Sequence, residues 1–189
     1  LKIIREAKET QPLAETAAPM PDVVARMRFV VAASRENVAR GAGGPFAAAV
    51  FERDTGRLVS LGVNLVERGG LSILHAEIVA LALAQKRLGA YDLSAPGLPA
   101  CELVSSAEPC AMCLGAVPWS GVRRLVAGAR GEDVEAVGFD EGAKPADWPA
   151  SLASRGVELI RDLSRDEAAA VLADYARLGR AIYNPRRQG

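Results

Sequence analysis

The chain has 189 residues, of which 50% are hydrophobic and 24% charged; this suits a single globular domain with a substantial core. Basic and acidic residues are equal at 23 each, which counts against a protein that grips long nucleic acid. No stretch approaches the about 20 apolar residues of a membrane helix, and three cysteines are an odd number for a disulfide framework. We therefore expect a cytoplasmic protein that acts on a small molecule, without membrane or nucleic-acid partners.

The first part of the chain predicts an arm followed by a helix. Residues 1–21 have mixed polarity and no clean period, and we assign them to an N-terminal arm. Asp22 is a candidate helix cap, and apolar residues then recur at helical spacing to about Arg40. The glycine-rich stretch 41–45 ends this helix.

A hairpin and a buried helix come next. Residues 46–51 and 58–65 are apolar runs on either side of a short turn, and they predict two strands of a hairpin. Residues 67–71 read as a loop. Residues 74–88 are apolar almost all round, which is typical of a helix buried on most of its faces.

The remaining elements alternate between strand and helix. Strands are predicted over 101–105, 122–127 and 157–163, with a helix that begins at Pro109 and runs to about Trp119. Ser164 is expected to cap a last helix that reaches about Arg180. Some thirty residues separate the fourth and fifth strands, enough for a crossover, so these two should be parallel. The predicted fold is α/β: a three-layer α/β/α sandwich with a five-stranded mixed sheet, formed by residues 22–180.

Three possible metal ligands stand at the starts of two helices. His75 is the only histidine and precedes Glu77 by two residues, whereas Cys110 and Cys113 are three apart behind a proline. Neutral imidazole and thiolate are ligands of Zn²⁺, and a helix N-terminus lowers the pKa of a thiol. Residues at i and i+3 share a helix face, so both sulfurs can reach one ion.

The number of ligands predicts a catalytic zinc site rather than a structural one. Cys101 falls within a strand, where a small buried cysteine is the simpler interpretation. Three protein ligands leave a fourth position for water, as catalytic zinc sites do. Glu77 could then move the protons of that water.

The combination of His75-Ala76-Glu77 with Pro109-Cys110-Ala111-Met112-Cys113 resembles the cytidine deaminase superfamily. The order of elements from 22 to 180 is also similar to that fold. Several further stretches resemble the bacterial guanine deaminase branch: 43–46, Asn64, 88–93, 112–116 and 137–141. The resemblance implies a zinc-dependent hydrolysis that removes an amino group from a nucleobase, with guanine, converted to xanthine and ammonia, as the first candidate.

The same resemblance implies roles for residues of this chain. Asn64 would orient the base, Asp140 or Glu141 would bind its edge, and Phe46 and Phe139 would wall the pocket. Ala76 is added to these substrate contacts, and Glu141 to Glu77 as a catalytic residue. Members of the branch form dimers that exchange a C-terminal segment, so a homodimer is expected, with the tail 181–189 as a lid or swapped segment.

Other interpretations stay open at this point. The substrate could be an aminotriazine, cytosine, a nucleoside or adenosine in a tRNA anticodon loop. The zinc site could be purely structural, or Cys110 and Cys113 could be the redox pair of a thiol oxidoreductase. Trp119, Trp148 and Tyr183 are expected to be packing residues.

Overall fold

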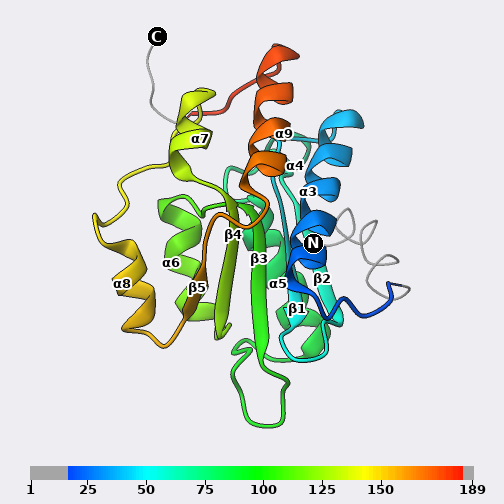
Figure 1. The fold of residues 1–189 in the computed structure, drawn as a ribbon, viewed down its shortest axis with the longest axis vertical. Coiled ribbons are helices and arrows are strands. Elements are labelled where there is room, and N and C mark those ends of the chain that lie inside the picture. Colours follow the sequence, from blue (N-terminus) through cyan, green and yellow to red (C-terminus); the bar gives the residue numbers. More distant parts are fainter. Residues whose placement is uncertain (1–16, 185–189) are drawn as a thin grey trace.

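The computed structural model describes residues 17–184 (Figure 1). The predicted arm and tail therefore lie partly outside the described residues. Within that part of the chain, no helix has the length and apolar character needed to cross a membrane.

The centre of the molecule is a five-stranded mixed sheet. Its strands are β1 (Ala47–Glu52), β2 (Leu58–Val63), β3 (Cys101–Ala107), β4 (Arg124–Ala129) and β5 (Glu158–Ile160), in the order β2-β1-β3-β4-β5. β1 is antiparallel to both β2 and β3, whereas β3, β4 and β5 are parallel. The predicted mixed sheet and the parallel pairing of the last two strands are confirmed.

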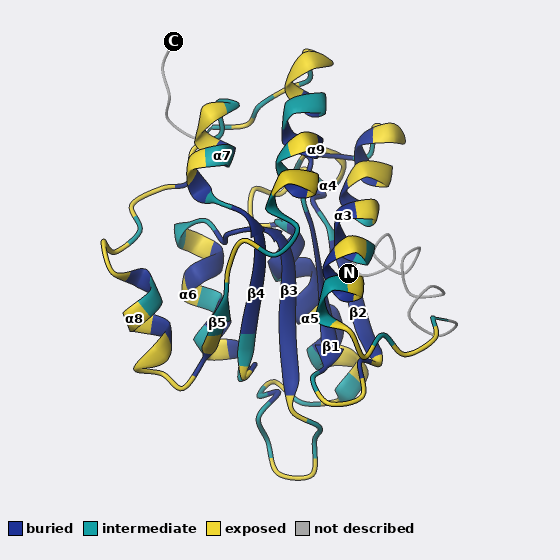
Figure 2. Ribbon diagram, in the orientation of Figure 1, coloured by how far each residue is buried: buried dark blue, intermediate teal, exposed yellow. Residues whose placement is uncertain are grey.

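Helices cover both faces of this sheet (Figure 1). On one face, α3 (Val23–Ala39) and α9 (Arg165–Arg177) pack against alternate strand residues such as Ala49 and Val104. On the other, α5 (Ala76–Leu88), α6 (Ala111–Ser120) and α8 (Trp148–Ala153) pack against the intervening residues, such as Val50 and Leu103. Because both faces are covered, β1 to β4 are buried along nearly their whole length rather than alternating between buried and exposed residues, and Figure 2 shows them as the buried centre. The three-layer prediction is confirmed.

Helix termini agree with the sequence in some places and differ in others. The Asp22 side chain accepts a hydrogen bond from the backbone N–H of Val24 (3.1 Å), as a cap should. The second metal-site helix begins at Ala111 with Cys110 as its N-cap, so the prediction that it starts at Pro109 is wrong. Ser164 makes no side-chain cap to α9, because its backbone is left-handed (φ 51°) instead of extended.

Three further predictions need correction. Residues 67–71 are not all loop, since α4 (Val66–Gly69) forms a short helix there. β5 is shorter than the predicted 157–163, because the left-handed backbone of Asp162 (φ 65°) cannot continue a strand. The insert between β4 and β5 contains α7 (Gly131–Ala136) and α8. Trp148 is buried as expected, but Trp119 is 80% exposed.

Candidate active site and metal centre

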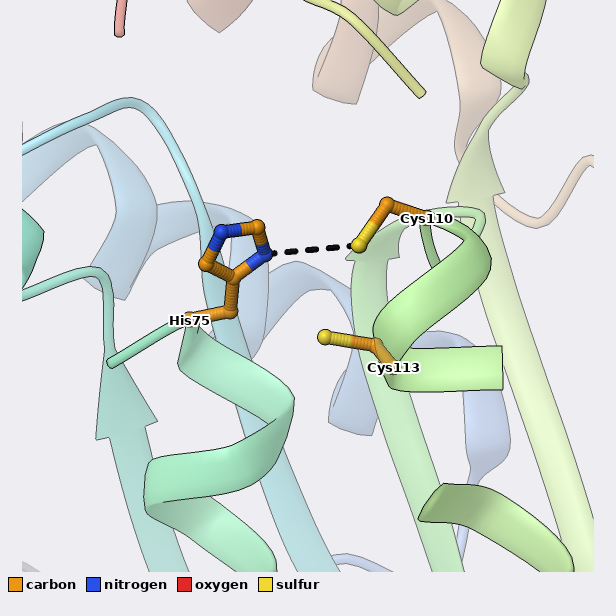
Figure 3. A group of neighbouring side chains, drawn as sticks. All are labelled: His75, Cys110 and Cys113. Atoms are coloured by element: carbon orange, nitrogen blue, oxygen red, sulfur yellow. Dashed lines mark hydrogen bonds between the residues drawn. The ribbon is translucent and has the colours of Figure 1, made fainter. Parts of the chain in front are cut away.

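The candidate site lies where α5 and α6 begin, next to the carboxyl end of β3 (Figure 3). His75 is the N-cap residue of α5 and Cys110 is the N-cap residue of α6. The two helices pack side by side on the same face of the sheet. Packing therefore brings together two helix starts that are 35 residues apart in the sequence.

His75, Cys110 and Cys113 form a group that could hold a metal ion. Their ligand atoms all lie within 4.8 Å of one another, and the Nδ1 atom of His75 is 3.4 Å from the Sγ atom of Cys110 (Figure 3). Tetrahedral ligands at roughly 2.0–2.3 Å from one zinc ion lie about 3.3–3.8 Å apart, and the separation between His75 and Cys110 falls in this range. The donor set and its spacing thus fit one zinc ion.

Cys101 does not belong to this group. It opens β3, at the end of the strand opposite to the one that leads to Cys110, and its Sγ donates to the carbonyl of Pro99 at 3.5 Å. Burial raises the pKa of the Cys101 thiol to about 11, so it stays protonated. A structural zinc site with Cys101 as a fourth ligand is therefore not what the described residues form, and neither Cys110 nor Cys113 is in a disulfide.

The electrostatics of the group favour a thiolate at Cys110. A hydrogen bond from Cys113, supported by one from His75, lowers the pKa of Cys110 to about 4. Burial lowers the pKa of His75, but the hydrogen bond and negative charge of Cys110 outweigh it and raise the pKa overall. A thiolate at Cys110 suits a divalent cation.

Glu77 stands in the first turn of α5, two residues after His75. The residue is buried, and burial, followed by the charge of Cys110, raises the pKa of its carboxyl group to about 7. A carboxyl group with such a pKa can both accept and release a proton near neutral pH. The arrangement therefore provides an acid–base group beside a metal site.

A cleft opens next to these groups, and the predicted residues meet there. The residues named from the sequence that line it are Phe46, Asn64, His75, Glu77, Cys110, Phe139, Asp140 and Glu141. The rings of Phe46 and Phe139 are in edge contact, with centroids 5.0 Å apart. The cleft thus combines apolar walls with a few polar groups, as small-molecule sites usually do.

Ala76 does not line this cleft. Its side chain is fully buried in the core between α5 and the sheet. The helix turns the side chain of the residue after His75 toward the sheet, and a contact between Ala76 and the substrate stays a prediction.

The side-chain amide of Asn64 has a defined orientation. Its Oδ1 atom accepts hydrogen bonds from the backbone N–H groups of Gly44 (3.4 Å) and Val66 (3.3 Å). The opposite orientation would turn the amide NH₂ toward two N–H donors, which cannot bond to it. The NH₂ group of Asn64 is therefore the part of the amide left to bind a ligand.

Four residues of the cleft were not connected with it by the sequence: Val66, Glu67, Glu108 and Tyr175. Glu108 is buried just before Pro109, and its carboxylate accepts hydrogen bonds from Arg161 (2.7 Å) and from the backbone of Gly131 (3.0 Å). Tyr175 belongs to the apolar stripe of α9 and reads from the sequence as core. Glu108 could have been suspected from the sequence, because it stands directly before the Pro109-Cys110 motif. No local signal in the sequence points to Tyr175.

The end of the described chain lies over the same cleft. Ala181 and Tyr183 line it, and the hydroxyl of Tyr175 donates to the carbonyl of Ala181 at 2.6 Å. The side chain of Asn184 accepts from the N–H of Asp140 (2.8 Å) and donates to the carbonyl of Gly138 (2.7 Å). Tyr183 is half-exposed at the cleft rather than a packing residue, because the segment runs across the surface of its own chain.

The fold and the His–Cys–Cys group together define a zinc-binding deaminase domain. A family model described as "Cytidine and deoxycytidylate deaminase zinc-binding region" matches residues 22–129. The chain belongs to this family, and its structure has the cytidine deaminase-like fold.

Within this family the chain is similar to guanine deaminases. A solved structure of guanine deaminase from Nitrosomonas europaea is 53% identical, with a TM-score of 0.85 over 88% of this chain and 91% of that one. A structure in complex with 2,6-diaminopurine is 54% identical, with the same TM-score over 89% of each chain. The guanine deaminase of Bacillus subtilis is 36% identical over 115 residues, which cover 61% of this chain and 69% of that protein.

Proposed function

We propose that this protein is a zinc-dependent aminohydrolase that converts guanine and water to xanthine and ammonia. The observation that carries the proposal is the buried carboxyl of Glu77, with a pKa near 7, beside the trio of His75, Cys110 and Cys113. These groups open into a cleft with aromatic walls. The similarity to guanine deaminases over most of the chain supports guanine as the substrate.

The chain's own residues have distinct tasks in this reaction. Zinc, when bound by His75, Cys110 and Cys113, would act as a Lewis acid that makes water a stronger nucleophile near neutral pH. Glu77 accepts one proton from the water and releases it to a ring nitrogen. It then accepts the second proton, from the hydroxyl group newly bonded to the ring carbon, and releases it to the departing amino group, which leaves as ammonia. A group with a pKa near the working pH is suited to both transfers.

The polar groups of the cleft match the edges of guanine. The NH₂ group of Asn64 donates to an acceptor of the base, its O6 atom. Carboxylates accept from the donors of the opposite edge, N1–H and the 2-amino group. Phe46 and Phe139, which are in contact with each other, form an apolar wall against which the base can pack.

Of the two acidic residues after Phe139, Glu141 is the better partner for the reacting edge. Burial raises the pKa of Glu141, against a hydrogen bond from Lys144 (2.9 Å) that lowers it. Asp140 is exposed, and its Oδ1 atom already accepts from the backbone of Gly142 (2.8 Å). We assign proton transfer or edge binding to Glu141, and a supporting role in the loop to Asp140.

The proposed assembly is a homodimer. None of the ten residues of α6 is charged, and Met112 and Trp119 expose apolar surface along it. Such surface on a folded chain indicates contact with another protein surface. Light scattering during size-exclusion chromatography measures the mass directly, and a monomer at micromolar concentration would contradict the assignment.

Ammonia release tests the proposed function. The zinc-loaded protein is assayed with guanine, adenine, cytosine, their nucleosides and aminotriazines, and we expect the highest kcat/KM with guanine and one xanthine per ammonia. Glu77→Gln should lower kcat by about 10²–10⁴-fold, the range for loss of a general acid–base. Its zinc content should not change, because Glu77 is not a ligand. Glu167→Gln, on the exposed face of α9, serves as control.

Two results would contradict the proposal. Preferential turnover of another base would reject guanine as the substrate. Normal turnover by zinc-replete Glu77→Gln would reject the role of this carboxyl group.

A further inference from the structure

We propose that Asn37, which does not line the cleft, is a positioning residue. It sets the preference of the site for purines with an oxygen, rather than an amino group, at position 6. It does so by holding the two backbone segments that orient Asn64. The inference rests on the function proposed above, because it assigns a cause to the preference for a base with an oxygen acceptor.

Asn37 lies in the last turn of α3 and is 4% exposed. Its Nδ2 atom donates to the carbonyl of Gly44 at 2.9 Å and to the carbonyl of Asn64 at 3.1 Å. A side-chain amide has two N–H groups, so Asn37 uses both. One side chain thereby joins the glycine-rich loop after α3 to the end of β2.

These two segments supply the environment of the Asn64 side chain. The N–H of Gly44 is one of the two donors that bind the Oδ1 atom of Asn64. The segments approach so closely that a Cβ atom on Gly43 would lie 2.0 Å from the backbone oxygen of Asn64. Asn37 therefore fixes the distance between the N–H of Gly44 and the Oδ1 atom of Asn64, which that N–H orients.

The orientation of Asn64 decides which atom of a purine can bind to it. With Oδ1 held by the backbone, its NH₂ group can donate to an oxygen at position 6 of the base but not accept from an amino group there. A looser loop would let the amide rotate and present its oxygen instead. Sites that bind a substrate by a fixed hydrogen bond reject an analogue that cannot form it. Loss of Asn37 should therefore weaken discrimination between 6-oxo and 6-amino purines.

Ser34 offers a matched control on the same helix, one turn earlier. It is also buried, and its Oγ atom donates to the carbonyl of Pro45 at 2.7 Å. Ser34→Ala thus removes a buried hydrogen bond between α3 and the same loop, with no contact to Asn64. A purely structural role for Asn37 would make Asn37→Ala behave like Ser34→Ala.

The experiment compares zinc-loaded wild type, Asn37→Ala, Asn37→Asp and Ser34→Ala. For each protein we measure zinc content, kcat and KM for guanine, and the Ki of 2,6-diaminopurine from its competition with guanine. Asn37→Ala should raise KM for guanine about ten-fold, the effect of losing one oriented hydrogen bond. Ki for 2,6-diaminopurine should stay within about two-fold of wild type and kcat within a few-fold, as expected for a lost binding contact.

The other two variants sharpen the comparison. Asn37→Asp places carboxylate oxygens against two carbonyl oxygens, so its preference for guanine should fall at least as far as that of Asn37→Ala. Ser34→Ala should keep the ratio of Ki to KM at its wild-type value, even if its melting temperature falls. Equal ratios in Asn37→Ala and Ser34→Ala would overturn the inference.

A measurement without substrate separates this inference from the proposed function. The side-chain amide of Asn64 can be followed by ¹⁵N NMR, and we expect lower order parameters in Asn37→Ala but not in Ser34→Ala. An Asn64 amide as ordered in Asn37→Ala as in wild type would overturn the inference whatever the substrate. Absence of guanine turnover by the wild type would instead overturn the proposed function, and the NMR result would then decide the role of Asn37 alone.

Discussion

A buried ion cluster at the N-terminal end of α3 gives a prediction for stability that is independent of the site. Arg26 is 1% exposed and forms a short ion pair with Glu102, which is completely buried. The same guanidinium donates to the carbonyls of Met20 (2.6 Å), Arg53 (3.0 Å) and Pro21 (3.1 Å). The cluster thus ties residues 20–21 and the start of β3 to the helix.

Arg26→Met should lower the free energy of unfolding by about 3 kcal/mol. Breaking a buried ion pair costs about 3–5 kcal/mol because a charge stays buried without its partner. The lower end applies here, since Arg124 still donates to the second oxygen of Glu102 at 2.6 Å. For a protein of this size each 1 kcal/mol lowers Tm by about 2–4 °C, so the expected decrease is about 6–12 °C.

Calorimetry and urea unfolding of the zinc-loaded protein measure the effect. Arg40→Met is the control, because Arg40 pairs with Glu36 in an exposed bridge (side chains 74% and 59% exposed) that contributes about 0–1 kcal/mol. The kcat/KM of folded Arg26→Met should equal that of wild type, because Glu102 lies at the end of β3 opposite to the site. A Tm decrease no larger than that of the control would refute the reasoning.

Three other predictions concern metal binding, pH and the base-binding loop. Cys113→Ser should lose most of its zinc by plasma emission analysis, whereas Cys101→Ser should keep it, since Cys101 is outside the ligand group. A hydrogen bond from Arg57 lowers the pKa of Glu52 below 4.5; its stabilisation is therefore complete above pH 4.5 and is lost as pH falls through the lowered pKa. Urea titrations should show wild type more stable than Glu52→Gln at pH 7, with the gap closing in acid, and a constant gap would contradict this. Gly43→Ala places a methyl group 2.0 Å from the backbone oxygen of Asn64, so KM for guanine should rise at least ten-fold. An unchanged KM would contradict this, because it would mean that the loop can shift without disturbing Asn64.

The local features of the molecule could be predicted from the sequence, because they depend on neighbouring residues. Mostly apolar runs of five to eight residues became strands, of which β1 to β4 are buried along nearly their whole length, and the cap at Asp22 is present. The spacing of Cys110 and Cys113 places both sulfurs on one side of a helix whatever the rest of the fold does. Sequence motifs of this kind pointed to the three candidate metal ligands and to Glu77, although only packing brings the two helix starts together.

Only the tertiary structure decided what several distant elements contribute together. Tyr175 reaches the cleft because α9 packs across the sheet, and the amide of Asn64 takes its orientation from a loop twenty residues away. Trp119 reads as core yet is exposed, since burial depends on whether another element covers that side of the helix. Periodicity fixes the relative directions of side chains within an element. Contacts between elements depend on how the elements pack, and local sequence patterns do not specify this packing.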